Sequence, residues 1–131
     1  MTEIAEITRV WNINDEIASD GFVEYNTTNW PGYWVKHLAP PRDIFRHMIN
    51  VVKLAPGARK VHAHEAENVM LVLEGEGEYY SDFDKTQPVK AGDVCVAMRQ
   101  QPHGMINTSD KLLVYFVVEG PLDEPQNTRL A

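Results

Sequence analysis

The chain has 131 residues, a net charge of −7 with histidines neutral, 44% hydrophobic residues and 24% charged residues. This length and composition are typical of one globular domain with a single core. Acidic residues are scattered, and the densest basic spot, Arg59-Lys60, is too small for a nucleic-acid-binding face, so we expect no nucleic-acid partner.

Localisation signals are weak along the whole chain. The N-terminal stretch MTEIAEITRVWNINDE has neither the basic start nor the apolar stretch of a signal peptide. The longest apolar runs, near 69–73 and 112–118, are too short to cross a bilayer. The single Cys95 excludes an intramolecular disulfide. We expect a cytoplasmic protein with no membrane partner.

The first forty residues read as an N-terminal arm. Asn14 is the predicted cap of a short helix over 15–19, which Gly21 would end. The stretch WPGYW at 30–34 is either a sugar-stacking platform or ligand lid, or part of an N-terminal arm that covers the outer face of a barrel or a dimer seam. The covering role is favoured, because aromatic side chains bury more often than they are displayed.

Residues 41–120 are predicted to form a barrel core, followed by a tail over 121–131, within one domain that spans 1–131. Apolar, β-branched segments separated by turn residues predict strands over 44–54, 60–64, 69–73, 78–83, 89–90, 94–97, 104–106 and 112–118. Their spacing indicates an all-β sandwich or barrel. Runs 48–52 and 112–118 are apolar on both faces and need an outer cover, from the N-terminal segment or a second subunit, so a homodimer is expected.

The chemistry-bearing pattern lies in VHAHEAEN, residues 61–68. On a strand, His62 and His64 point to the same face, and Asn68 continues that parity if the turn keeps the register. A third imidazole is available at His103. His37 and His47 are interpreted as ordinary core or surface histidines, and Cys95, between valines, as core.

Two motifs resemble the cupin superfamily of small double-sheet β-barrels. In the family the first motif runs Gly, five residues, His-x-His, three or four residues, Glu, six residues, Gly. Here only four residues separate Gly57 from His62, and Asn68 stands in place of the glutamate, six residues before Gly75. The second motif runs Gly, five residues, Pro-x-Gly, two residues, His, three residues, Asn. Its counterpart is Gly92, Met98-Arg99-Gln100, His103 and Asn107.

This resemblance implies a double-stranded β-helix, or jelly-roll, barrel with a metal held by His62, His64 and His103. Asn68 would be a weak or vacant fourth position, because an amide oxygen coordinates weakly and adds no charge. Glu67 has the opposite parity, and a bulge would be needed to turn it inward. Three imidazoles suit Fe, Zn, Ni, Mn, Co or Cu.

The expected ligand is a small oxygen-rich or aromatic metabolite. Parity predicts a pocket lined by Arg46, Met48, Met70 and Met105, although each methionine taken alone is more typical of core. Arg46 would bind a substrate carboxylate if it faces inward, and would be solvated at the barrel edge. The leading hypothesis is a metalloenzyme, either a dioxygenase or a non-redox isomerase, cyclase or lyase. The alternative is a non-enzymatic ligand-binding or sensing cupin, and a weaker third reading is a structural partner protein.

Overall fold

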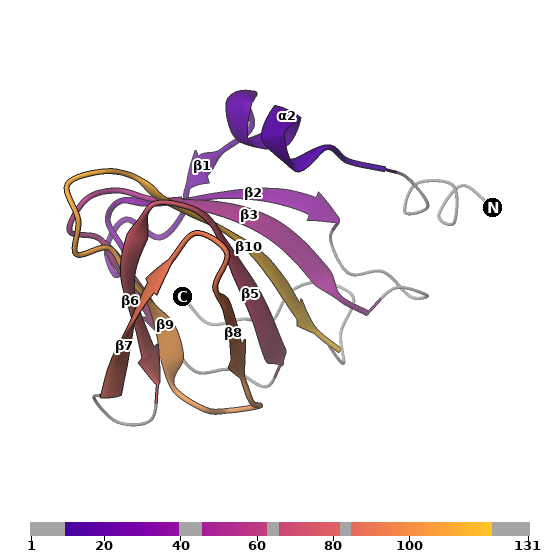
Figure 1. Ribbon diagram of the computed structural model, residues 1–131. Coiled ribbons are helices and arrows are strands. Elements are labelled where there is room, and N and C mark those ends of the chain that lie inside the picture. Colours follow the sequence, from indigo (N-terminus) through magenta and orange to yellow (C-terminus); the bar gives the residue numbers. More distant parts are fainter. Residues whose placement is uncertain (1–9, 40–45, 63–65, 82–84, 122–131) are drawn as a thin grey trace.

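Two antiparallel sheets form the body of the protein (Figure 1). The computed structural model describes residues 10–39, 46–62, 66–81 and 85–121. The larger sheet has six strands, in the order β1 (Val23–Glu24), β2 (Tyr33–Ala39), β3 (Met48–Leu54), β10 (Leu113–Gly120), β5 (Glu67–Glu74) and β8 (Val94–Ala97). The smaller has four, in the order β4 (Arg59–His62), β9 (His103–Ile106), β6 (Glu76–Ser81) and β7 (Lys85–Lys90). The all-β prediction is confirmed.

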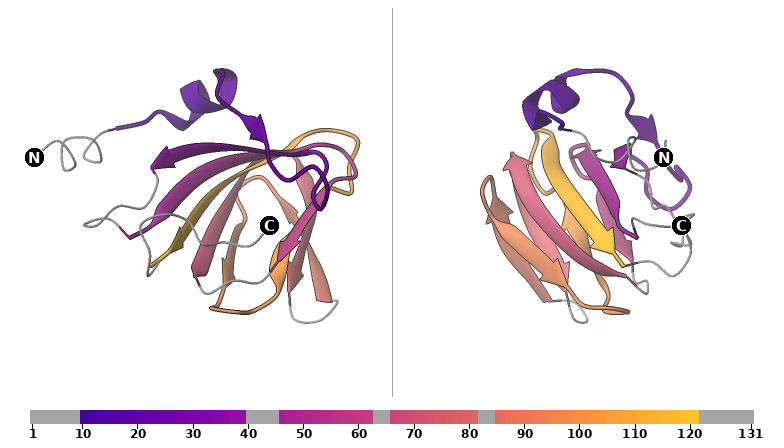
Figure 2. Two further views of the ribbon diagram at one scale, coloured as in Figure 1. Left: turned by 180° about the vertical axis from the view of Figure 1, so that it is seen from behind. Right: turned by 90° about the vertical axis from the view of Figure 1, so that its right-hand side faces the viewer.

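The main hydrophobic core lies between the two sheets, which Figure 2 shows from two further sides. Val52, Val72 and Tyr115 enter it from the larger sheet, and Tyr79 and Met105 from the smaller one. Alternating side chains of each strand point into this core, as the period of a strand requires. The arrangement is the predicted double-stranded β-helix. Cys95 also lies in this core, as expected.

The strand β2 comes from the segment that the sequence analysis assigned to an arm. It pairs along its length with β3, and Tyr33 lies opposite Leu54. Trp30 and Tyr33 are buried in the core cluster, whereas Trp34 is 40% exposed on the other side of the strand. Trp30 and Tyr33 therefore lie inside the barrel and do not cover its outer face.

The short helix α2 (Ile13–Ala18) lies outside the larger sheet (Figure 1). Its cap is Asn12, whose side chain accepts a hydrogen bond from the Asp15 backbone N–H at 3.0 Å. The prediction that Asn14 caps the helix is wrong, since Asn14 lies within the first turn. No helix in the described ranges is long and apolar enough to cross a membrane.

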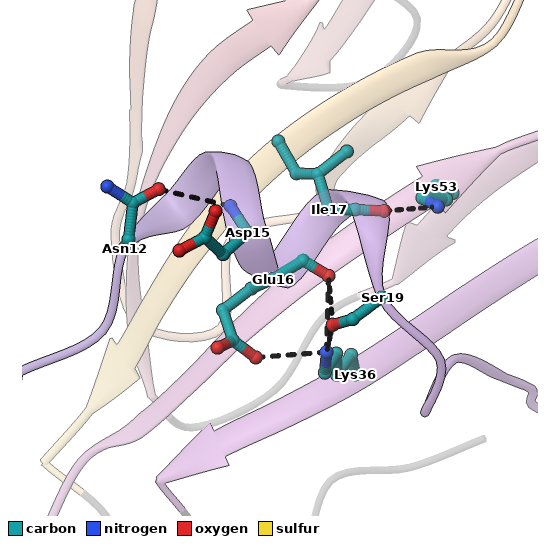
Figure 3. Close-up of polar contacts among 7 residues, drawn as sticks. All are labelled: Asn12, Asp15, Glu16, Ile17, Ser19, Lys36 and Lys53. Atoms are coloured by element: carbon teal, nitrogen blue, oxygen red, sulfur yellow. Dashed lines mark hydrogen bonds and ion pairs between the residues drawn. The ribbon is translucent and has the colours of Figure 1, made fainter.

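Two lysines tie α2 to the outer face of β2 and β3 (Figure 3). Lys36 forms an ion pair with Glu16 at 2.9 Å, and Lys53 donates to the Ile17 carbonyl at 2.7 Å. The outward-facing Val51 and Val114 are almost completely buried. The N-terminal segment thus provides part of the outer cover that the apolar strands require.

One strand is longer than predicted, because polar residues take part in the backbone pairing between strands. The segment Lys85–Lys90 pairs along its length with β6, although the sequence predicted a strand over only 89–90. Backbone hydrogen bonds define this edge strand, and its side chains are mostly exposed. The predicted strand over 60–64 is described only up to His62, and strand β3 begins at Met48, two residues beyond Arg46.

Candidate functional site

A small pocket lies at one end of the core, between the two sheets. Its free volume is about 20 Å³, room for one water molecule or one ion. The residues that line it are Tyr33, Asn50, Val52, Lys60, His62, Asn68, Met70, His103, Gly104, Tyr115, Val117 and Glu119. Most of these side chains are buried, and a charged group there interacts in a medium less polarisable than water.

His62 and His103 are neighbours in this pocket. They lie opposite each other in the β4–β9 pair, and their ring centroids are 4.8 Å apart. The next residue, Gly104, lies opposite Val61, and any side chain there would collide with the Lys60 carbonyl and the Val61 Cα. Glycine therefore permits the close approach of β4 and β9 that brings the two imidazoles together.

The buried His103 has a defined tautomer. Its Nδ1 lies 2.7 Å from the Gln101 carbonyl oxygen, which only accepts hydrogen bonds, so Nδ1 carries the proton. The Nε2 lone pair is then the one that could bind a metal, and metal-binding histidines usually donate their other ring N–H to a carbonyl in this way. Burial lowers the pKa of His103 below its ordinary value, and the Lys60 charge lowers it further, while the Gln101 hydrogen bond and the Glu119 charge oppose this.

The three other residues considered as metal ligands differ in their placement. His64 lies outside the described residues. Asn68 is buried and lines the pocket, whereas Glu67 is exposed. The irregularity in the β5–β10 register lies between Val114 and Tyr115, at the other end of the strand from Glu67. Among the described residues, no three His, Cys, Asp or Glu side chains form a group that could hold a metal ion by themselves.

Lys60 is a pocket residue that the sequence analysis assigned to a basic surface spot. Its side chain is 5% exposed, and its Nζ lies 3.4 Å from both ring nitrogens of His62. The same Nζ lies 4.3 Å from the ring centroid of Trp30 and 4.6 Å from that of Tyr33. The sequence did indicate this position, because Lys60 lies two residues before His62 and their side chains point to the same face of the strand.

Glu119 is the second pocket residue that the sequence analysis missed. It is 3% exposed and lies directly opposite Asn68 in the β5–β10 pair. The alternation of side chains along β10 also places Glu119 at the pocket, since Tyr115 and Val117 on the same face line it. The pocket thus has a carboxylate, on a strand next to the position where the family motif has one.

The four residues predicted to form the pocket wall have different environments in the structure. Met70 lines the pocket. Met48 and Met105 are buried in packed core, and neither belongs to the described lining. Arg46 is partly exposed just before β3, also outside that lining. Asn50, in contrast to Arg46, lines the pocket, and its side-chain Oδ1 lies 2.6 Å from Nδ1 of His37.

The described pocket contains side-chain donors of the kind that a divalent transition metal accepts. Two adjacent imidazoles, one with its proton fixed on Nδ1, border a cavity of the size of one ion. The Asn68 amide oxygen is a weak further donor beside them. A divalent ion there would add to the Lys60 charge beside His62, and the Glu119 carboxylate would offset only part of the total.

Comparisons with known proteins agree with this reading of the fold. The model of the cupin domain family (Cupin_2) matches residues 50–119. A curated relative, the oxalate-binding protein of Thermotoga maritima, is 38% identical over 69 residues, which are 51% of this chain and 56% of the relative. The chain therefore matches little more than half the length of that protein.

Solved structures show the same architecture. A predicted oxalate decarboxylase from Thermotoga maritima has a TM-score of 0.67 at 24% identity, over 80% of this chain and 96% of that one. A cupin-like protein from the same organism has a TM-score of 0.69 at 24% identity, over 78% and 80% of the two chains. At these identities the likeness concerns the fold alone. With more than half of its residues matched by the family model, the chain belongs to the cupin domain family.

Proposed function

We propose that this protein is a metal-dependent enzyme that acts on a small oxygen-rich metabolite. The supporting observation is the pairing of His62 with the buried, tautomer-fixed His103 at the edge of an ion-sized cavity. These two imidazoles would hold the metal, with His64 as the third ligand and Asn68 as a weak fourth. The metal would be Fe, Zn, Ni, Mn, Co or Cu, all of which accept imidazole.

The bound metal would act as a Lewis acid toward a substrate oxygen or, if it is redox-active, would support oxidation. The chain itself supplies the setting for this chemistry. The Gln101 carbonyl orients the His103 ring through Nδ1–H. Val52, Met70 and Val117 form the apolar part of the wall of the same cavity.

Positive charge at the pocket favours an anionic substrate. A bound divalent metal together with Lys60 would outweigh the single Glu119 carboxylate, and the similarity to a protein named oxalate-binding agrees with a small carboxylate ligand. The reaction is either a dioxygenation or a non-redox isomerisation, cyclisation or elimination, as the three-imidazole cupin site implies. We also infer a cytoplasmic location, consistent with the single buried Cys95.

The alternative is a binding cupin without catalysis. Asn68 favours it, because the carboxylate ligand of the family motif is absent at that position. The name of the curated relative, which describes binding and no reaction, also supports this alternative.

A substrate screen separates the two functions. Protein reconstituted with each candidate metal is incubated with small organic acids, with and without O₂, and products are measured by mass spectrometry. The proposed enzyme gives a metal-dependent product, and an O₂ requirement identifies the dioxygenase. Ligand-induced thermal stabilisation that survives chelation, without any product, would instead establish the binding cupin.

A further inference from the structure

The barrel has an open seam between β7 and β8. These are the last strands of the smaller and the larger sheet, and no backbone ladder joins them in the described part of the chain. A cleft with a free volume of about 490 Å³, here called the seam cleft, lies along them. Its polar lining consists of the side chains of Tyr79, Ser81, Gln87, Asp93 and Gln101 and the backbone of Val96. This volume is typical of a small-molecule site, whereas the pocket at His62 and His103 has room for one ion only.

The smaller sheet presents polar side chains to the seam cleft from its inner face. Tyr79 and Ser81 are two residues apart on β6, and Gln87 lies directly opposite Tyr79 on β7, so the three side chains share one face. Tyr79 is buried in the core, whereas Gln87 is exposed at the edge of the sheet. Within the described ranges, neither the Ser81 hydroxyl nor the Gln87 amide takes part in a side-chain hydrogen bond. Both groups are therefore available to a ligand.

The larger sheet contributes backbone groups to the seam cleft. The Tyr79 hydroxyl donates to the Val96 carbonyl at 3.2 Å, so this carbonyl points away from β5 and toward the smaller sheet. The N–H and C=O of one residue point the same way in an antiparallel strand, so the Val96 N–H also faces the cleft. Beyond β8, the Gln101 side-chain oxygen accepts from the Met98 N–H at 3.0 Å, which holds this side chain in the lining.

The charge of the seam cleft disfavours anions. Asp93 is the one charged residue in its described lining, which contains no lysine or arginine. Its carboxylate accepts from the Lys90 backbone N–H at 2.8 Å, which fixes its position. The other polar groups are hydroxyls, amides and a backbone N–H, which together offer both donors and acceptors. The hydroxyl groups of a neutral sugar or polyol also donate and accept, and they complement this lining.

We propose that the seam cleft is a binding site for a neutral polyhydroxylated ligand, either a monosaccharide or a polyol of similar size. Gln87 and Asp93 would hold its hydroxyl groups, and Pro88 and Val89 would contact its C–H groups. This inference goes beyond the proposed function, because the described linings of the seam cleft and of the metal pocket have no residue in common.

The test titrates full-length protein with glucose, galactose, myo-inositol and glycerol, up to about 50 mM, before and after treatment with a chelator. Backbone amide NMR shifts give the affinity and the location of binding. Gluconate, a polyol with a carboxylate, is the charged comparison. Gln87→Leu removes both functions of the amide at similar size. Thr86→Val is the matched control, because Thr86 is the exposed neighbour on β7 and lies outside the described lining. Asp93→Asn removes the charge and keeps an oxygen for the Lys90 N–H.

We expect at least one neutral probe to bind with a dissociation constant of about 10 mM or less and to shift amides of β6, β7 and β8. Gln87→Leu should weaken this binding at least about fivefold, and Thr86→Val should stay within about twofold. Gluconate should bind at least about threefold more weakly than that probe, and Asp93→Asn should remove the difference, because a repulsion is lost. If Gln87→Leu does not fold, Ser81→Ala replaces it, with an expected loss of about threefold.

Four results would overturn the seam-cleft site. They are no binding by any of the four neutral probes, binding that Gln87→Leu or its replacement leaves unchanged, binding that disappears on chelation, and gluconate binding as tight as that of the neutral probes. The chelated samples also separate the two proposals. Binding that survives chelation supports the seam cleft whether or not the protein is a metalloenzyme, and a protein that takes up no metal contradicts only the proposed function.

Discussion

Glu119 on β10 lies directly opposite Asn68 on β5, and both buried side chains line the same pocket. The family motif has a glutamate at position 68, so the pocket has an amide at that position and a carboxylate one strand away. Directly opposed residues of an antiparallel pair have Cβ atoms only about 5 Å apart. The pocket therefore has one negative charge that acts on the His103 imidazole, on the strand next to the position where the family motif has its glutamate.

Restoring the carboxylate at position 68 should strengthen metal binding. We expect Asn68→Glu to raise the affinity for divalent metal at least about tenfold, because an anionic oxygen replaces a weak amide donor. Asn68→Gln is the matched control, similar in size and uncharged, and should give no gain. Competition with a chromogenic chelator measures both. Equal affinities for the two variants would show that position 68 does not face the metal.

Asn107 should be a stability residue. Its Nδ2 donates to the carbonyls of Leu54 at 2.9 Å and Lys111 at 2.7 Å, and its Oδ1 accepts from both the backbone N–H and the hydroxyl of Ser109. Asn107→Ala leaves the buried Leu54 carbonyl and the partly buried groups of Lys111 and Ser109 without this partner, and should lower the free energy of unfolding by about 2–4 kcal/mol. Urea denaturation measures the loss. Ser109→Ala, the control, should cost about 1 kcal/mol, and an equally small loss in Asn107→Ala would contradict this role.

Cys95 should be unreactive in the native protein. Burial, with a smaller contribution from Asp93, raises the pKa of its thiol to about 11. The folded state therefore favours the protonated thiol, and this contribution to stability is present below the unfolded value of 9.0 and lost as the pH rises toward about 11. At pH 8 we expect disulfide-exchange labelling at least about a hundredfold slower than in urea. Equal rates would mean that Cys95 is accessible.

The part of the pocket that the sequence predicted follows from the alternation of side chains along a strand. Alternation placed His62, Asn68 and Met70 on an inward face, and the structure has all three lining the pocket. The same alternation also places Lys60 and Glu119 on an inward face. Charged residues near turns are usually exposed to solvent, however, so the sequence analysis did not predict that these two are buried. Their burial depends on long-range pairing, which no local pattern encodes.

The N-terminal region shows a second limit. Strand β2 lies in the segment that was assigned to an arm, and its polar residues Lys36 and His37 interrupt the apolar pattern of the strand. Pairing with β3 supplies its backbone partners, and the salt bridge from Lys36 to Glu16 uses the polar side chain on the outer face. The helix cap was misplaced by two residues, because Asn12 and Asn14 are equally good caps in sequence and only the fold selects between them.

We propose that the protein is a homodimer that covers the outer face of β5 and β8. Strand β8 is the edge of the described larger sheet, and its Val94 and Val96 are 62% and 64% exposed beside Val69 at 46%. Light scattering should give twice the chain mass, and Val96→Glu should shift it toward the monomer. Leu112→Glu, an exposed apolar residue elsewhere, is the control. A wild-type monomer at about micromolar concentration would contradict the proposal.

The metal content of the His103→Ala variant tests the central claim most directly. Wild-type protein purified without chelators should contain about one equivalent of a transition metal, and His103→Ala should lose most of it, while His47→Ala keeps it. Elemental analysis of the three proteins decides. Less than about a tenth of an equivalent in the wild type, unrecovered by reconstitution, or full stoichiometry in His103→Ala, would contradict the metal site described here.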